Sequence, residues 1–178
     1  MNGRTLRHAL RSVPTSVAVV CTLSGATPVG HTIGTFVSVS LDPPLVGYLA
    51  MHGSETLEAV RRSGAFSVNV LGAHQAELGR RFAQRSSDRP DRFAGLAWRP
   101  GPNGCPHLAG TTTVLDCDLH DVLTLGDHEL VIGRVTAATT ASSATPPLVF
   151  SAGSFTTVAA TSPDRHWLPD HSRGTLGG

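Results

Sequence analysis

The chain has 178 residues, enough to bury one core and too few to make two domains the expectation. Its 14 basic and 13 acidic side chains give a formal net charge of +1, without the basic stripe that a nucleic-acid partner would require. The three cysteines form no close pair, the first residues hold no apolar segment of signal-peptide length, and nowhere do eighteen apolar residues run together. We therefore expect a reduced, cytoplasmic protein with no membrane span.

The first half of the chain predicts two helices and three extended segments. Residues 5–13 place apolar side chains at helical spacing, and Pro14 would end that helix. Extended patterns rich in β-branched residues follow at 16–23, 31–40 and 45–50. The last two are divided by the sequence SLDPP, whose paired prolines fix a stiff bend. A short helix then begins with Ser54 as its cap and ends at Gly64.

The second half predicts another helix and the remaining strands. Residues 65–71 alternate apolar and polar side chains, which is typical of a strand with one buried face, and residues 73–84 predict a second inserted helix. The stretch 85–110 is rich in turn-forming residues, and we expect Phe93 and Trp98 to attach it to the core. Further strands are expected at 114–120, from 128 onward, at 148–153 and at 154–159.

About seven or eight short strands with two inserted helices and no regular βαβ alternation argue against a doubly wound parallel sheet. They favour a mainly β fold, an antiparallel barrel, which also leaves few exposed strand edges. We assign residues 1–160 to this one domain. Residues 161–178 are rich in Pro, Gly, Asp and His, and we expect them to form a flexible C-terminal tail.

Several common catalytic motifs are absent from the sequence. No HxxxH, HxH or CxxC pattern places two metal ligands on one element, so we expect no metal site. There is no GxSxG elbow, no Walker loop, and no GxGxxG that opens a helix after a strand. If the protein uses NAD(P)H, it does not hold this nucleotide on a Rossmann domain of its own.

One region, residues 29–72, concentrates groups suited to binding a flat polar ring and a phosphate. Hydroxyl groups come from Thr32, Thr35, Ser38 and Ser40. Gly34 allows a close main-chain approach, and Ser54 and Thr56 stand where unpaired helix amides favour an anion. Arg80 or Arg81 could supply a countercharge. Taken singly, these features more often belong to ordinary strands, a helix cap and a solvated face, and only the joint pattern favours a binding site.

The tripeptide GDH at residues 126–128 also has two interpretations. Gly126 and Asp127 supply turn conformations, so His128 could simply begin the returning strand of a hairpin. A turn at the mouth of a sheet is also a place where a cofactor meets a titratable side chain. The tripeptide by itself does not decide between them.

The order of several segments closely resembles the flavin reductase-like family, the small reductase components of two-component flavin-dependent monooxygenases related to the FMN-binding split barrel. The segments are PTSVAVVCT, VGHTIGTFVSVSLDPPLVGYL, GSETLEAVRRSGAFSVNVLGAHQAELGRRFA, DRFAGLAW, CPHLAGTTTVLDCDL, GDHELVIGRV and PPLVFSAGSFTTVA. The resemblance covers about residues 5–158. The combination of SLDPP with a downstream GDH and IGRV is its most specific part.

The resemblance implies a homodimeric antiparallel split β-barrel that binds FMN or FAD. It would accept hydride from NADH or NADPH and release reduced flavin to a separate flavin-dependent monooxygenase. Alternatives are a split-barrel flavoprotein that acts directly on an organic substrate, and a non-catalytic barrel that carries flavin or haem. Many members carry Ser or Asn where this chain has Gly34, and an apolar residue where it has His31, which leaves the choice between FMN and FAD open.

The same resemblance assigns roles to individual residues. The residues implied to line the flavin are Thr32, Ile33, Gly34, Thr35 and Phe36, and the further cofactor-binding residues are Ser38, Asp42, Pro43 and Asn69. Ser54 and Thr56 match the phosphate grip, while Arg81 and Phe82 match the residues that help close the site. His128 matches the family histidine near the nicotinamide and is the expected catalytic residue.

Overall fold

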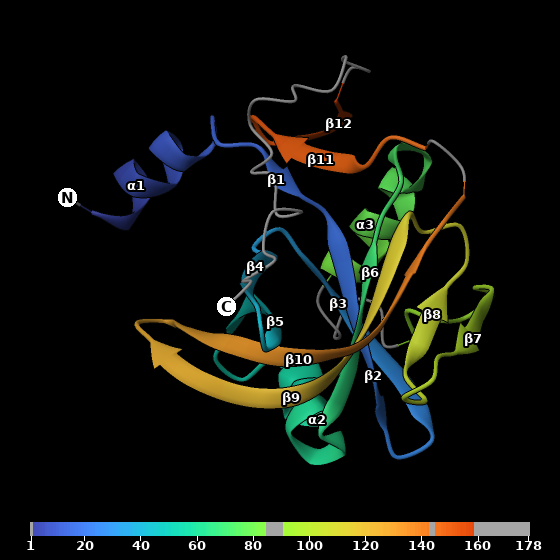
Figure 1. Cartoon of the computed structure of the whole chain (residues 1–178). Coiled ribbons are helices and arrows are strands. Elements are labelled where there is room, and N and C mark those ends of the chain that lie inside the picture. The colour runs from blue at the N-terminus through green and yellow to red at the C-terminus, as the bar shows by residue number, and fades with distance from the viewer. Residues whose placement is uncertain (1, 85–90, 143–144, 159–178) are drawn as a thin grey trace, which may run out of the picture.

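The computed structural model describes residues 2–84, 91–142 and 145–158, and within them it forms a split barrel (Figure 1). The barrel is a seven-stranded antiparallel sheet in the order β3-β2-β6-β9-β10-β5-β4. Its strands are β2 (Ala18–Ser24), β3 (Thr27–Ile33), β4 (Val37–Leu41), β5 (Pro44–Met51), β6 (Ala65–Val70), β9 (Thr113–Leu125) and β10 (His128–Thr140). The sequence-based prediction of an antiparallel barrel is confirmed.

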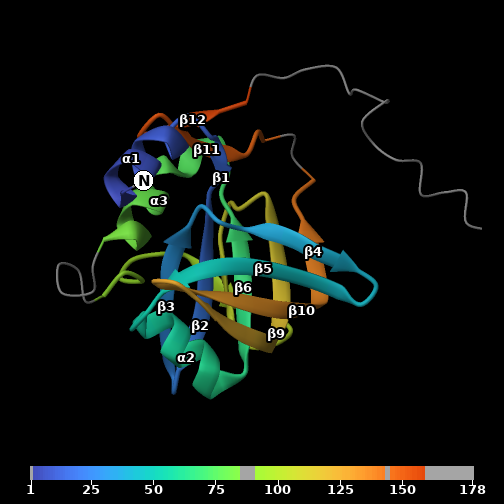
Figure 2. The ribbon, with the colours of Figure 1, turned by 90° about the vertical axis from the view of Figure 1, so that its left-hand side faces the viewer.

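Four helical segments and two smaller sheets accompany the barrel in the described ranges. The helices are α1 (Gly3–Leu10), α2 (Glu55–Ser63), the 3-10 turn η1 (Ala73–Gln75) and α3 (Ala76–Ala83). Of these, α1 buries none of its residues. The small sheets are β1 (Thr15–Ser16) with β11 (Leu148–Ser151) and β12 (Ser154–Thr157), and the hairpin of β7 (Trp98–Pro100) with β8 (Pro106–Leu108). Figure 2 shows α2 at one end of the barrel and α3 at the other, beside β11 and β12.

Strand β2 is buried on both faces and separates two hydrophobic clusters, which explains the unbroken apolar run VAVVC in the sequence. The first cluster fills the barrel and consists of Ala18, Val20, Ile33, Val46, Tyr48, Ala50, Leu57, Val60, Phe66, Val68, Cys117 and Val131. The second lies outside the barrel, toward α3 and β8, and consists of Val17, Val19, Cys21, Leu71, Phe82, Phe93, Leu108 and Leu148. Alternate side chains of β2 enter alternate clusters.

Two sequence-based expectations need correction. Residues 31–40 form two strands instead of one extended segment, because the chain leaves the sheet between Ile33 and Val37. At Gly34 it passes so close to Thr15 that an added Cβ would lie 2.9 Å from the Thr15 hydroxyl oxygen. No strand was predicted in the turn-rich stretch 85–110, yet its described part contains the β7–β8 hairpin.

The burial of Phe93, the end of the first helix before Pro14 and the cap of α2 agree with the sequence-based expectations. Phe93 is buried, and its ring packs edge-on against Phe82 at 5.0 Å and against Trp98 at 6.1 Å between centroids, which attaches the excursion to the outer cluster. The first helix ends before Pro14, and Ser54 caps α2. None of the helices in the described ranges is long and apolar enough to cross a membrane. The tail predicted at 161–178 lies outside the described residues.

Candidate functional site

The loop between β3 and β4 presents main-chain groups that no strand uses. Among the described residues, the main chain of Gly34, Thr35 and Phe36 makes no hydrogen bond. The register of the β4–β5 ladder would place Thr35 opposite Leu49, since Val37 pairs with Gly47. The Thr35 hydroxyl occupies that place: it accepts from the Leu49 amide at 2.9 Å and donates to the Leu49 carbonyl at 3.3 Å. The side chain therefore fixes the loop and leaves its peptide groups available to a ligand.

The residues on either side of this loop anchor it. The Thr32 hydroxyl donates to the Gly79 carbonyl at 2.8 Å, which ties β3 to α3. Ile33 is buried inside the barrel, and Phe36 packs against the same cluster from a half-buried position. Thr32, Ile33 and Phe36 thus position the loop within this chain.

A cavity of about 370 Å³ lies at the N-terminus of α2. It is lined by His31, Met51, His52, Gly53, Ser54, Glu55, Thr56, Ala83, Gln84 and Arg92. The Ser54 hydroxyl caps the helix by accepting from the Leu57 amide at 3.4 Å, and Thr56 is buried in the first turn. A helix start, two hydroxyl groups and a guanidinium in one cavity suit a phosphate or another anion. The structure thus brings the predicted Ser54 and Thr56 together.

Arg92 and His31 set the charge of this cavity, together with the acidic Glu55. The Arg92 guanidinium reaches across to β3 and donates to the Gly30 carbonyl at 2.8 Å. Burial lowers the pKa of His31, and the nearby Arg92 lowers it further, so this ring is neutral at pH 7. Arg92 carries the positive charge at this wall, and Glu55 partly offsets it.

His52 joins the cavity to the GDH turn. Its Nδ1 lies 3.0 Å from a Glu129 carboxylate oxygen, and its Nε2 lies 3.0 Å from the Gly126 carbonyl oxygen. Arg61 of α2 binds the other oxygen of Glu129. Both partners of the ring are acceptors, so both nitrogens donate only when the ring is protonated. The hydrogen bond to Glu129 and then that to Gly126 raise the pKa of His52, and the same contact lowers the pKa of Glu129.

His128 begins β10 immediately after the turn, where it pairs with Met51 of β5 and Leu125 of β9. Its ring is partly exposed, and Nδ1 lies 2.7 Å from the Asp127 carboxylate. The hydrogen bond from this ring is the main cause that lowers the pKa of Asp127. The pairing places His128 and His52 at the same end of β5.

Ser38, Asp42 and Pro43 lie elsewhere in this chain. All three are exposed, Ser38 on β4 and the other two in the turn from β4 to β5, where the Asp42–Pro43 peptide bond is cis. The eight residues of β5 separate this turn from the cavity at Ser54, a span of roughly 25 Å at about 3.3 Å per residue. The structure does not bring Asp42 and Pro43 to Ser54 within one chain.

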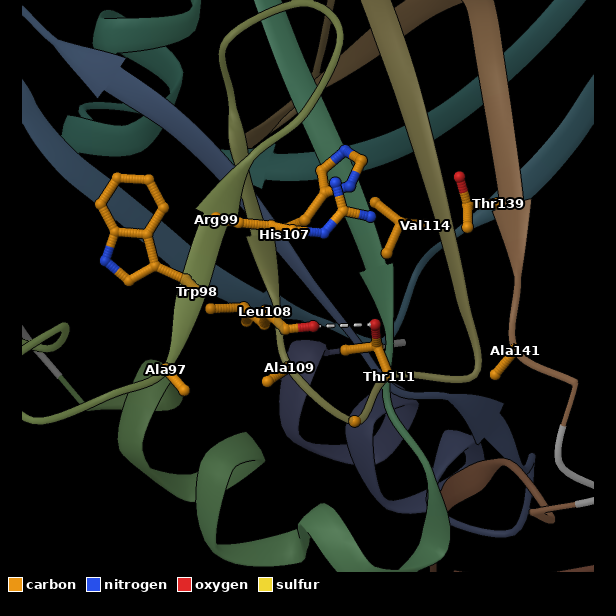
Figure 3. A pocket seen from close by; sticks show the side chains of 11 residues that line it. Ala97, Trp98, Arg99, His107, Leu108, Ala109, Thr111, Val114, Thr139 and Ala141 are labelled. Atoms are coloured by element: carbon orange, nitrogen blue, oxygen red, sulfur yellow. Dashed lines mark hydrogen bonds between the residues drawn. The ribbon is translucent and has the colours of Figure 1, made fainter.

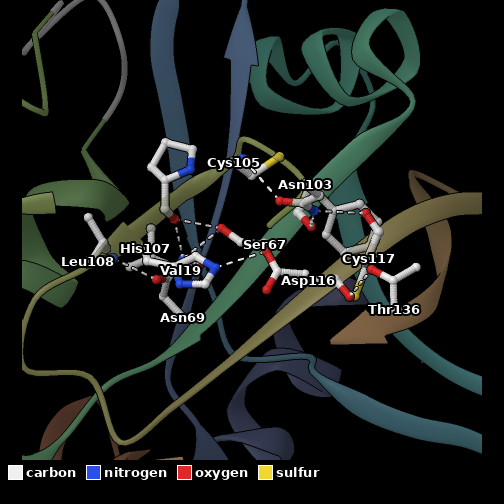
Figure 4. Close-up of polar contacts among 12 residues, drawn as sticks. Val19, Ser67, Asn69, Asn103, Cys105, His107, Leu108, Asp116, Cys117 and Thr136 are labelled. Atoms are coloured by element: carbon white, nitrogen blue, oxygen red, sulfur yellow. Dashed lines mark hydrogen bonds and ion pairs between the residues drawn. The ribbon is translucent and has the colours of Figure 1, made fainter. Parts of the chain in front are cut away.

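Asn69 also lies away from the cavity. It is a buried residue of β6 whose side chain contacts β8 (Figure 4). Its amide nitrogen lies 3.0 Å from the Ser67 hydroxyl, 3.2 Å from the Pro106 carbonyl and 3.3 Å from the Val19 carbonyl. Its oxygen accepts from the Leu108 amide at 2.8 Å. This side chain attaches β8 to the barrel, since its donor and acceptor groups are all used by neighbouring strands.

Arg81 and Phe82 of α3 contact other parts of the protein and not the cavity. The Arg81 guanidinium donates to the Ala94 carbonyl, and Phe82 is fully buried in the outer cluster. Neither lines the cavity at α2, whereas Arg92 from the neighbouring segment does.

The structure adds His52 and Arg92 to the residues expected from the sequence. The partners His52–Glu129 and Arg92–Gly30 lie tens of residues apart in the chain. The sequence signals were the position of His52, two residues before the predicted helix cap, and the place of Arg92 in the segment DRFAGLAW.

Another cavity lies under the β7–β8 hairpin (Figure 3). It contains Arg99 and His107, and His107 Nε2 lies 2.9 Å from a buried Asp116 oxygen. It has no helix N-terminus in its lining, and none of the residues predicted for flavin or nicotinamide lines it. The cavity at α2 is therefore the better candidate site.

Comparison with known proteins shows the same family and the same architecture. The family model of the flavin reductase like domain matches residues 10–159. A reductase subunit of a flavin-dependent monooxygenase, HsaB of Mycobacterium tuberculosis, is 36% identical over 173 residues, covering 96% of this chain and 90% of that protein. An NADH:FMN oxidoreductase of Rhodococcus erythropolis is 39% identical over 84% of this chain and 78% of its own.

Among solved structures, nitrilotriacetate monooxygenase component B from Mycobacterium thermoresistibile superposes with a TM-score of 0.87. It is 34% identical, and the match covers 97% of this chain and 96% of that one. Both the sequence and the architecture are thus shared over nearly the whole length. The chain belongs to the flavin reductase-like family.

Proposed function

We propose that this protein is an NAD(P)H-dependent flavin reductase that supplies reduced flavin to a partner monooxygenase. The observation that carries the proposal is the main chain of Gly34–Phe36, which makes no hydrogen bond to any other described residue. Thr35 fixes this loop to β5, the strand that leads to the start of α2. A flavin mononucleotide has a ring at one end and a phosphate at the other. The loop at residues 34–36 suits the ring, and the start of α2 suits the phosphate.

The residues would hold the cofactor in the following way. Peptide groups of residues 34–36 would face the isoalloxazine ring, while Ser54, Thr56 and the first amides of α2 would bind the phosphate. Arg92 adds a positive charge to the same wall. When bound, a flavin supplies the electron-accepting ring for hydride from a reduced nicotinamide, so the protein's task is to position two rings.

His128 would form the wall against which the nicotinamide lies. His52 contributes indirectly, because its bonds to Gly126 and Glu129 hold the GDH turn against the end of β5. His52 is thus a positioning residue for the turn that carries His128. No side chain in this arrangement has to move a proton during hydride transfer.

The exposed edge of the sheet supports a homodimer. Strand β4 is the last of the seven, and Val37, Val39 and Leu41 are 48%, 45% and 76% exposed on it. An apolar edge strand of this kind is a template for pairing with another chain. In a dimer formed through this edge, Asp42 and Pro43 would lie toward the second copy. The three buried free cysteines suit a reducing cytoplasm.

The decisive experiment is anaerobic mixing of the purified protein with FMN and NADH or NADPH. Loss of the oxidised-flavin absorbance at a rate set by the protein concentration supports the reductase. Flavin binding without bleaching by either nucleotide would instead indicate a flavin carrier. A matched sample of the Thr35→Val protein should bind less FMN and bleach it more slowly at subsaturating flavin.

A further inference from the structure

A second cavity, of about 540 Å³, lies at the end of α3. It is lined by Arg80, Ala83, Gln84, Phe150, Gly153, Ser154 and Phe155. Ala83 and Gln84 also line the anion-binding cavity at α2. The two cavities therefore lie on either side of one helix end, and a helix with its side chains is about 10–12 Å across.

Aromatic side chains form the floor of this second cavity. Phe150 of β11 and Phe155 of β12 are cross-strand partners with ring centroids 5.4 Å apart, packed edge to face. The Phe155 ring is supported by α3 at Gly79, where an added Cβ would lie 3.2 Å from it. Phe150 remains 41% exposed, which is unusual for so large an apolar ring on a small outer sheet.

A positive charge lies directly on this floor. The Arg80 guanidinium sits 5.3 Å from the centroid of the Phe155 ring, in a cation–π arrangement, and also contacts Glu77 one turn earlier at 3.3 Å. An exposed phenyl ring beside a guanidinium plane is the combination on which proteins stack nucleic-acid bases. Among the described residues, neither Asp nor Glu lines the cavity.

We propose that this aromatic cavity binds the adenosine half of FAD, so that FAD binds more tightly than FMN. The inference rests on the proposed function, which places the flavin phosphate in the cavity at α2. From that phosphate, the second phosphate and the ribose of FAD would have to pass the end of α3, where Ala83 and Gln84 line both cavities. The purine would then contact Phe150, and the Arg80 guanidinium would lie toward the phosphates of FAD. NADH carries the same adenosine group, but its nicotinamide end would lie at His128.

The test compares FMN, FAD and AMP in one set of variants. Phe150→Leu keeps an apolar side chain on β11 and removes the aromatic face, and Arg80→Gln removes the charge. Arg62→Gln, an exposed arginine on α2 outside both cavities, is the matched control. Dissociation constants come from flavin fluorescence titration, and AMP is added as a competitor. The KM for NADH is measured with FMN as the flavin.

The wild-type protein should bind FAD about tenfold more tightly than FMN, and Phe150→Leu should weaken FAD binding by about the same factor, as expected for loss of one base-stacking contact. FMN binding should stay unchanged in this variant and in the control. AMP should displace FAD at concentrations that leave FMN bound.

Equal affinities for FMN and FAD in the wild type would overturn the inference. So would a Phe150→Leu protein that loses FMN and FAD equally, or one in which only the KM for NADH rises, since the adenosine bound there would then be that of NADH. If FAD is not preferred but FMN still binds and is reduced, the inference about the aromatic cavity fails and the proposed function stands. Absence of binding by both flavins would instead refute the proposed function.

Discussion

Replacement of Thr35 by valine removes the hydroxyl group that fixes the candidate flavin loop while keeping the shape of the side chain. The structure assigns this hydroxyl two hydrogen bonds, both to the main chain of Leu49, at 2.9 and 3.3 Å. Each such bond contributes about 0.5–1.5 kcal/mol net, and the exposure of Thr35 and the length of the second bond put the pair near the lower end, at about 1–1.5 kcal/mol.

Part of this free energy should appear in flavin binding, because the loop must then be ordered by the ligand. FMN affinity is expected to fall up to about tenfold, since 1.4 kcal/mol corresponds to a factor of ten. Fluorescence titration with FMN measures it, and urea denaturation without flavin measures the loss of folding stability separately. Thr35→Ser, which keeps the hydroxyl, is the control and should stay within about twofold of the wild type in affinity.

If Thr35→Val binds FMN with the affinity of the wild type while Thr35→Ser behaves identically, the loop is not held by this side chain for flavin binding. If both variants lose stability equally, the hydroxyl does not replace the missing strand partner of Leu49. Either result would refute the role of Thr35 in holding the loop, on which the proposed flavin site depends.

Three further outcomes follow from the same geometry. His128→Ala should raise the KM for NADH or NADPH about three- to tenfold, the value of one lost hydrogen bond, while the FMN dissociation constant stays constant in parallel titrations. Thr56→Val should weaken FMN binding but leave riboflavin binding unchanged, because riboflavin has no phosphate; equal loss of both would contradict the phosphate assignment. The pKa of His52 is raised by its hydrogen bond to Glu129, so its contribution to stability is complete below pH 6.5 and is lost as the pH rises through the raised value. Thermal melts across this range should show the difference between wild type and His52→Gln shrinking toward alkaline pH, and a difference that does not depend on pH would show that the ring is not held as a cation.

The sequence predicted the barrel well because β-branched alternation and helix caps are local signals. Ser54 as the start of α2 and the burial of Phe93 follow from patterns of a few residues. The break at Gly34 was missed because both flanking segments favour strand, and the close approach of Thr15, which leaves no room for a Cβ at position 34, is visible only in the structure.

Site residues that depend on distant partners were harder to predict. Asn69 stands on the polar face of a strand that looked open to a ligand, but β8, about forty residues later in the chain, covers that face. His52 and Arg92 gain their place from contacts with Glu129 and Gly30, which no spacing along the chain reveals. Ser54 and Thr56 could be placed at the start of α2 from the sequence alone, because the cap of a helix is a local signal.

The position of β2 between the two hydrophobic clusters has a consequence for how the molecule melts. Because this strand is a wall of both clusters, neither can lose its packing without exposing the other. The domain should therefore denature in one cooperative transition, with the same midpoint whether the probe reports on the barrel interior or on the side that faces α3. In hydrogen exchange, the amides of Ala18 to Cys21 should be among the last to exchange, and they should open only when the whole domain unfolds.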